Sequence, residues 1–165
     1  MTRHGIGEQS YQMTDTVLYR LVQLAKIHRN ELARELAKLG MYIGQEQVLL
    51  NLWEADGVSQ AELGARVQVL PPTLTKMLQR MERSGLVRRE RTGTRGRASW
   101  VYLTDRGWQL RGEVEALWRH AECALTAGLD EDELSVLHGY LARLKGLETA
   151  LETADFGPDR GVDLD

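Results

Sequence analysis

The chain has 165 residues and a mass of 18.7 kDa, which suits a single domain and leaves little room for two. Hydrophobic residues make up 42% and charged residues 27%, as in ordinary soluble proteins, and no apolar run is long enough to cross a membrane. The single cysteine, Cys123, excludes an internal disulfide and fits a cytoplasmic location.

Charge is unevenly distributed along the chain. The net charge is −3, yet the segment from Ser59 to Arg97 holds nine basic and three acidic residues, a balance of +6, so the remainder carries −9. A basic centre between acidic ends indicates a surface that binds a polyanion. Five of the bases fall within ten positions: Arg88, Arg89, Arg91, Arg95 and Arg97.

Apolar residues at helical spacing predict three helices in the first part of the chain, at 11–39, 45–55 and 60–67. Gly40 ends the first helix. Ser59 is expected to cap the third, with Glu62 in the position of a capping-box acid. The apolar stripe of the first helix consists of Val17, Leu21, Leu24, Ala25, His28, Leu32, Leu36 and Leu39.

A fourth helix is predicted from Pro71 to Ser84, because proline suits the first turn of a helix and Gly85 ends it. Its buried face is expected to be Leu74, Met77, Leu78 and Met81. The opposite face is polar and basic, which suits contact with DNA. It consists of Pro72, Thr75, Lys76, Gln79, Arg80 and Arg83, with Thr73 at its edge.

The stretches "LVRRER" and "SWVYLT" then predict two strands joined by a turn. A long helix is expected from Thr104 or Asp105 to about Leu125, and a last one begins in "GLDEDELSVL". Residues 153–165 have little to bury and are predicted to form a flexible tail. The last helix carries a leucine seam of Leu134, Leu137, Leu141, Leu144, Leu147 and Leu151.

A short helix, a turn, a second helix and a basic hairpin occur in the order of a winged helix-turn-helix. In that arrangement the second helix enters the major groove and its first turns reach base edges. The loop of the hairpin reaches the adjacent minor groove, whose narrow negative channel attracts arginine. The arginine cluster is therefore expected where the molecule touches DNA.

Residues 39–110 resemble the MarR (multiple antibiotic resistance regulator) family of bacterial transcription factors. The resemblance is carried by SQxEL from Ser59, PTLTxxLxRME from Pro72, GLVxR from Gly85 and LTxxG from Leu103. Each motif is weak alone, but the combination at these separations is specific. The chain departs from the family pattern twice. Arg95 replaces the aspartate that usually stabilises the hairpin, which is called the wing. Leu70 stands where a serine-like cap often precedes the second helix of the motif, which is called the reading helix.

The resemblance implies a mainly α fold in one domain spanning 1–165, with a winged helix-turn-helix at 44–104 between dimerisation helices at 11–39 and 105–152. It also implies a homodimeric repressor that binds a pseudo-palindromic operator in double-stranded DNA and is released by a small aromatic, lipophilic or oxidising effector. The residues expected to bind DNA are Ser59, Gln60, Pro72, Thr73, Thr75, Lys76, Gln79, Arg80, Arg83, Arg95 and Arg97.

In the family the effector occupies a cleft between the dimer helices and the DNA-binding lobe. Candidates to line such a cleft here are Tyr19, His28, Arg29, Trp53 and Trp118, although a lone histidine on an apolar stripe, such as His28, is more often a hydrogen-bonded core residue. Cys123 is interpreted as a buried structural thiol in preference to a redox sensor. His120 and Cys123 share a helical face, but two ligands do not make a zinc site, and His138 is only a guess as a third. No metal or cofactor is expected.

The sequence has no phosphate-cradling glycine loop, nucleophile elbow or dense cluster of histidines and carboxylates, so an enzyme is not expected. The alternative is a winged-helix protein-interaction module that does not bind DNA. Such a module does not require the net charge of +6 between Ser59 and Arg97, which therefore favours DNA binding. A third possibility is an architectural DNA-binding protein without an effector.

Overall fold

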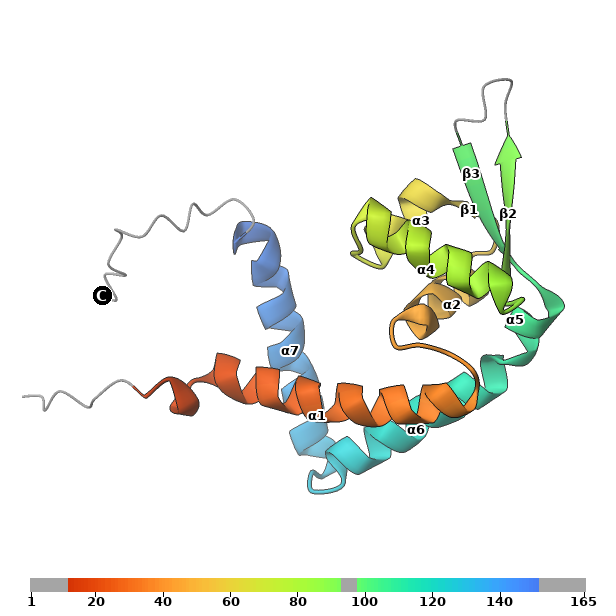
Figure 1. Ribbon diagram of the computed structural model, residues 1–165. Helices are drawn as coiled ribbons and strands as arrows, with labels where there is room; N and C mark the ends of the chain where they lie inside the picture. The colour runs from red at the N-terminus through yellow and green to blue at the C-terminus, as the bar shows by residue number, and fades with distance from the viewer. Residues whose placement is uncertain (1–11, 93–97, 152–165) are drawn as a thin grey trace, which may run out of the picture. The chain divides into compact units, whose positions relative to one another are not determined.

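The computed structural model describes residues 12–92 and 98–151. The chain divides between Ala121 and Glu122 into two compact units. Figure 1 shows the order of the elements, which are mainly helical with one small sheet. Among the described residues, none of the helices is long and apolar enough to span a membrane.

The first unit opens with a short 3-10 turn at Met13–Asp15, followed by the helix α1 (Val17–Lys38). The hydroxyl of Thr16 accepts a hydrogen bond from the Tyr19 amide and so starts α1 at this point. The helix predicted from residue 11 therefore begins later than expected. Gly40, with a φ of +72°, follows its end as predicted.

The apolar stripe of α1 meets the core only near the end of the helix. Leu36 is fully buried, and Leu32 and Leu39 pack against the same core. The first half of α1 instead leaves its apolar side chains exposed in the single chain. The exposed side chains include Val17, Leu18, Leu21, Val22, Leu24 and Ile27.

Three helices follow close to their predicted bounds: α2 (Gln45–Glu54), α3 (Gln60–Arg66) and α4 (Pro71–Arg83). Ser59 caps α3 by accepting a hydrogen bond from the Glu62 amide at 3.2 Å, as predicted. The Glu62 carboxylate accepts a hydrogen bond from Arg66, so it supports α3 through the next turn of the helix.

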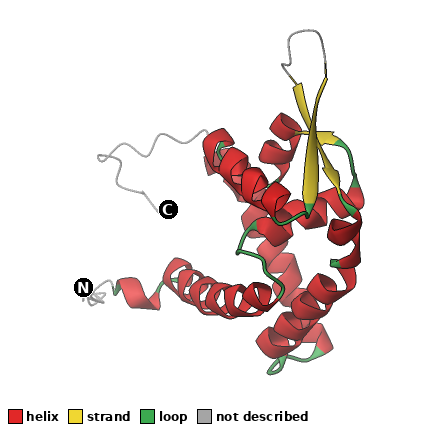
Figure 2. Ribbon diagram, turned by 45° about the vertical axis from the view of Figure 1, so that its right-hand side comes forward, coloured by secondary structure: helices red, strands yellow, loops and turns green. Residues whose placement is uncertain are grey.

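The sheet contains one strand more than the two that were predicted. β2 (Val87–Thr92) and β3 (Ala98–Leu103) form the antiparallel hairpin, with Val87 opposite Leu103. The short strand β1 (Val58–Ser59) pairs with the other edge of β3, giving the order β1-β3-β2. Figure 2 shows the hairpin projecting from the helices that surround its base.

The prediction of a single helix from Thr104 or Asp105 to about Leu125 is wrong. The structure has two helices there, α5 (Asp105–Gln109) and α6 (Arg111–Thr126). The chain bends at Leu110, whose side chain is buried along with that of Val114. Because Leu110 and Val114 preserve the apolar spacing through the bend, periodicity alone could not reveal it.

The second unit contains the end of α6 and the last helix, α7 (Glu131–Leu151). A reciprocal capping box starts α7. The Asp130 carboxylate accepts a hydrogen bond from the Glu133 amide, and the Asp130 amide donates to the Glu133 carboxylate. The acids that were predicted to open this helix therefore act through specific hydrogen bonds.

The core of the first unit is built around α4. Its side chains Leu74, Leu78 and Met81 are buried as predicted, and Met77 packs against the same core. The remaining fully buried side chains come from each neighbouring element, so the helices and the hairpin share one core. They are Leu36, Val48, Leu49, Leu52, Leu63, Leu86, Val101 and Val114.

A close contact at Gly107 joins three parts of the first unit, which are α2, α5 and the turn that follows α4. The Trp53 side chain is 7% exposed, and its indole Nε1 donates a hydrogen bond to the Gly107 carbonyl at 3.1 Å. The Thr104 hydroxyl donates to the Gly85 carbonyl and accepts from the Gly107 amide. A Cβ atom on Gly107 would overlap the Leu86 carbonyl oxygen, so only glycine fits at this position.

We expect Gly107→Ala to lower the free energy of unfolding by about 1–3 kcal/mol, the usual cost of overpacking a core. The matched control is Gly112→Ala in α6, where an added Cβ meets nothing within 4 Å. This control should leave stability unchanged or raise it by up to about 1 kcal/mol, because alanine favours helix over glycine. Urea unfolding at one fixed protein concentration measures both, and equal effects would contradict the packing described.

The Glu46 carboxylate is buried at the start of α2. The residue is 3% exposed, and its carboxylate accepts a hydrogen bond from the Gly44 amide at 2.6 Å. Burial raises the pKa of Glu46 above its ordinary value, although hydrogen bonds and the positive charge of Arg29 act in the opposite direction. Folding therefore favours the protonated carboxyl group.

The stability that Glu46 contributes is fully present below its unfolded pKa and is lost as pH rises through the higher folded pKa. Glu46→Gln removes this ionisation while retaining an acceptor oxygen. The free energy of unfolding of the variant should therefore rise relative to the wild type as the pH is raised above about 4.5. Urea unfolding across this range measures the difference, and a difference that does not change with pH would contradict the assignment.

Candidate nucleic-acid interface

The helices α3 and α4 form the helix-turn-helix that the sequence predicted. Residues 67–70 connect them, with Gln68 in a left-handed conformation at a φ of +52°. Pro71 and Pro72 occupy the first turn of α4, and Leu70 precedes them without any side-chain hydrogen bond to the helix. The start of α4 therefore lacks a polar cap, as the leucine at this position suggested.

The outer face of α4 is basic and open to solvent. Lys76, Arg80 and Arg83 are exposed and form no ion pair within residues 12–92 and 98–151. The Arg80 guanidinium lies 5.6 Å from the centre of the exposed Tyr42 ring, a cation–π contact that no local pattern in the sequence indicated. Pro72, Thr73 and Gln79 complete the exposed face.

Three side chains at the starts of α3 and α4, all expected to contact DNA, take part in local hydrogen bonds. Gln60 Nε2 donates to Thr75 Oγ1 at 2.8 Å, and Thr75 Oγ1 donates to the Pro71 carbonyl at 2.9 Å. These bonds connect the first turn of α3 to the first two turns of α4. Together with the Ser59 cap of α3, they fix the two helices relative to each other.

An ion pair connects α4 to the hairpin. The Glu82 carboxylate accepts hydrogen bonds from the Arg89 guanidinium at 2.8 and 2.5 Å and from the Arg89 amide at 3.1 Å. Both side chains are largely shielded from solvent, so this pair is screened less than an exposed one. The pairing was not predicted, because Glu82 and Arg89 lie on different elements and no local pattern joins them.

The five arginines of the hairpin are therefore not equivalent. Arg89 is neutralised by Glu82, while Arg88 pairs with Glu90 and lies 4.4 Å from the centre of the Tyr102 ring. Arg91 is exposed. Two members of the arginine cluster, Arg88 and Arg89, thus already have acidic partners within the protein. The residues expected to reach the minor groove, Arg95 and Arg97, lie outside the described residues.

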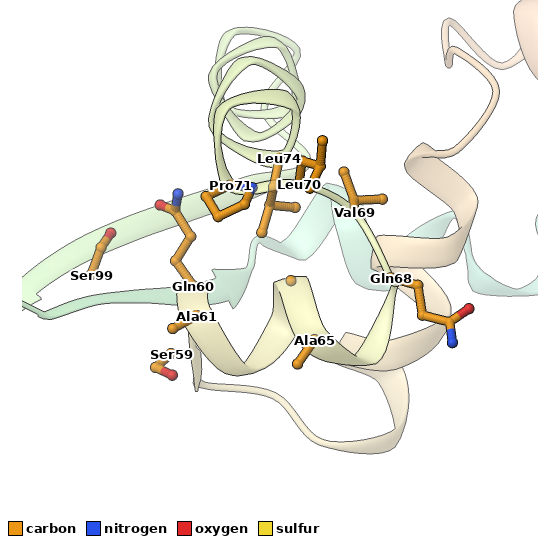
Figure 3. Close-up of a pocket in the computed structure, with 11 residues that line it drawn as sticks. Ser59, Gln60, Ala61, Ala65, Gln68, Val69, Leu70, Pro71, Leu74 and Ser99 are labelled. Carbon is orange, nitrogen blue, oxygen red and sulfur yellow. The ribbon is translucent and has the colours of Figure 1, made fainter. Parts of the chain in front are cut away.

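A hollow of about 760 Å³ opens between α3 and the start of α4. Figure 3 shows its lining, which is mainly apolar near the beginning of α4. Leu74 points toward α3, whereas Leu70 lies at the rim and is turned away from Leu74. The hollow therefore borders the first turn of the helix that is expected to read DNA.

The five candidate effector residues lie on three helices, α1, α2 and α6. Trp53 belongs to the core, and its indole N–H is already bound to Gly107, which argues against its proposed place in a cleft. Tyr19 and Arg29 are exposed on α1, and Trp118 is exposed on α6. His28 is half-buried, with Nδ1 4.0 Å from the Glu31 carboxylate.

Cys123 is exposed, so the prediction of a buried structural thiol is wrong. It lies on α6, and the spacing of residues could not establish which side of this helix is covered. Within the part of the chain that the structure describes, no three histidine, cysteine or acidic side chains are placed to hold a metal ion.

Residues 41–94 match the family model of the MarR family. The HTH-type transcriptional regulator TtmR of Methylorubrum extorquens is 40% identical over 101 residues, which are 61% of this chain and 51% of TtmR. This chain thus spans about half of that relative. The HTH-type transcriptional repressor Rv2887 of Mycobacterium tuberculosis is 31% identical over 111 residues, which are 67% of this chain and 80% of the repressor.

Solved structures support the same assignment. A crystal structure of MarR superposes with a TM-score of 0.71 at 27% identity, covering 84% of this chain and all of that one (100%). The transcriptional regulator SlyA superposes with a TM-score of 0.72 over 79% of this chain and 93% of SlyA, at 23% identity, which shows the fold. The chain therefore belongs to the MarR family, whose members are transcription regulators and not enzymes.

Proposed function

We propose that this protein is a homodimer that binds a specific DNA operator as a repressor and leaves it when a small molecule binds. The observation that carries the proposal is the exposed face of α4, on which three cations lack acidic partners among the described residues. A DNA backbone would supply the missing negative charge. The names of the relatives, a transcriptional regulator and a transcriptional repressor, support the same function.

In this proposal α4 enters the major groove. Thr73, Lys76 and Gln79 lie on the exposed face within its first turns, where side chains reach base edges. Arg80 and Arg83 lie further along the helix and are suited to phosphates, with Pro72 at the start of the helix. Ser59, Gln60 and Thr75 then support binding mainly by holding α3 and α4 in place, because their polar groups are already hydrogen-bonded.

The hairpin would contact the adjacent minor groove. Arg91 is exposed near the end of β2, and Arg95 and Arg97 follow it in the sequence. Arginine is attracted to the negative potential of a narrow minor groove. Because Glu82 holds Arg89 on β2, the wing is anchored to the reading helix itself.

Dimerisation would cover apolar surface that a single chain leaves exposed. In α7 the side chains of Val136, Leu137, Tyr140, Leu141 and Leu144 are exposed, and α1 has its own exposed apolar side chains. Contiguous apolar patches of this kind usually mark an interface. We therefore assign the segments 11–39 and 105–152 to dimerisation, in one functional domain with the winged helix-turn-helix.

Release by an effector requires that it bind two arrangements of the dimer with different affinity. Tyr19, His28 and Arg29 on α1 and Trp118 on α6 remain the proposed contacts, and a small aromatic or lipophilic compound is the proposed ligand. Release of bound operator by such compounds tests this part of the proposal. No membrane or cofactor is required.

In-vitro selection from random DNA should yield a pseudo-palindromic operator. Gln79→Ala should then narrow the affinity gap between operator and random DNA by about 1–3 kcal/mol, the typical cost of removing one base-specific hydrogen-bonded pair. The matched control is Gln109→Ala, which removes an exposed glutamine from α5 and should leave the gap unchanged. Fluorescence anisotropy measures both variants.

The wing variant Arg95→Ala plus Arg97→Ala should weaken operator and random DNA alike. It should also reduce the slope of log affinity against log salt by about 0.9 for each phosphate that is no longer neutralised. Binding that does not respond to salt, or an unchanged affinity in the wing variant, would reject the proposed interface. Failure to enrich any DNA would favour the protein-interaction alternative.

The dimer should persist below micromolar concentration, with a mass about twice 18.7 kDa in sedimentation equilibrium. Leu141→Asp plus Leu144→Asp should abolish the dimer, and much of the fold with it, because charges would replace its apolar seam. Ser135→Asp plus Ala142→Asp adds the same charge on the other side of α7 and should leave the dimer intact. A folded wild-type monomer at these concentrations would refute the assembly.

A further inference from the structure

We propose that Leu70 recognises the 5-methyl group of a thymine in the operator. The inference rests on the proposed function, because it names one feature of the DNA that α4 would read. It concerns the first turn of α4 and the hollow beside it, and not the basic part of the helix.

Leu70 is 74% exposed directly before α4, whereas Leu74 one turn later is 1% exposed. A residue in this position usually carries a hydroxyl, amide or carboxylate that caps the helix. Leu70 supplies none, and it makes no compensating contact with the core, to which Leu74 belongs. Its apolar side chain is therefore placed at the surface at the start of the reading helix.

The first turn of α4 has fewer hydrogen-bond donors than usual, and Thr73 supplies those that remain. Pro71 and Pro72 have no backbone N–H, and the Thr75 hydroxyl is bound to Gln60 and to the Pro71 carbonyl. A helix start of this kind is poorly suited to a phosphate, which needs donors. It is better suited to an apolar group on the DNA.

The hollow of about 760 Å³ continues this apolar surface. Ala61, Ala65 and Val69 line it together with Pro71 and Leu74, and Leu70 lies at its rim (Figure 3). Among the base edges of the major groove, thymine is distinguished by its methyl group, which apolar side chains contact. Lys76 and Gln79 follow Leu70 on the same helix. A contact between Leu70 and a thymine methyl group would therefore add one apolar base contact to the polar ones proposed for Lys76 and Gln79.

The test replaces each thymine of the selected operator, one at a time, by deoxyuridine, which removes only the 5-methyl group. For the wild type, one position in each half-site should lose affinity about fourfold, the equivalent of one buried methylene group at ~0.8 kcal/mol. For Leu70→Ser the loss at that position should disappear, while Leu70→Met, which keeps an apolar side chain, should retain it. Leu70→Ser also offers a helix cap, so loss of the fold is not expected.

An operator without any methyl-sensitive position would overturn the inference and leave the proposed function standing. A loss of affinity that persists in Leu70→Ser would also overturn it, because another side chain or the shape of the DNA would then be responsible. Failure to select any operator would reject the proposed function and this inference together. The control Gln109→Ala should show the wild-type response to deoxyuridine at every position.

Discussion

Gly107 lies against the carbonyl oxygen of Leu86 so closely that a side chain would not fit between them. The same glycine accepts the indole hydrogen bond of Trp53, and its amide is bound by the Thr104 hydroxyl. Because Leu86 follows α4 and begins the hairpin, this one contact fixes the end of the reading helix, the base of the wing and the start of α5 against α2. The proposed spacing of the two DNA-contacting elements therefore depends on a buried backbone contact that carries no charge.

The basic side chains of α4 and the hairpin have two different roles. The Glu82–Arg89 pair and the contacts of Arg88 with Glu90 and Tyr102 use arginine to hold the hairpin to α4 and to itself. Lys76, Arg80 and Arg83 have no acidic partner within the described ranges, so we propose that their charge is available to DNA. The positive charge of the segment is thus partly structural. Two of the five hairpin arginines, Arg88 and Arg89, already make contacts within the protein.

Local patterns predicted the helix-turn-helix well, because its boundaries are encoded by single residues: Ser59 caps α3, Pro71 opens α4, and Gly85 closes it. They missed features that depend on distant residues or on packing. The strand β1 has only two residues, too few for any periodicity, and exists because Val58 meets Val101. The bend at Leu110, the Glu82–Arg89 pair and the exposure of Cys123 likewise follow from tertiary contacts that spacing does not contain.

The central claim is that α4 reads the major groove while the wing contacts the minor groove of the same half-site. Dimethyl sulfate interference tests both parts at once, since it methylates guanine N7 in the major groove and adenine N3 in the minor groove. We predict interference at guanines in two clusters whose centres are about one helical turn, roughly 34 Å, apart, with interference at adenines next to each cluster. Interference confined to the minor groove, or a single cluster without a symmetric partner, would contradict this mode of binding.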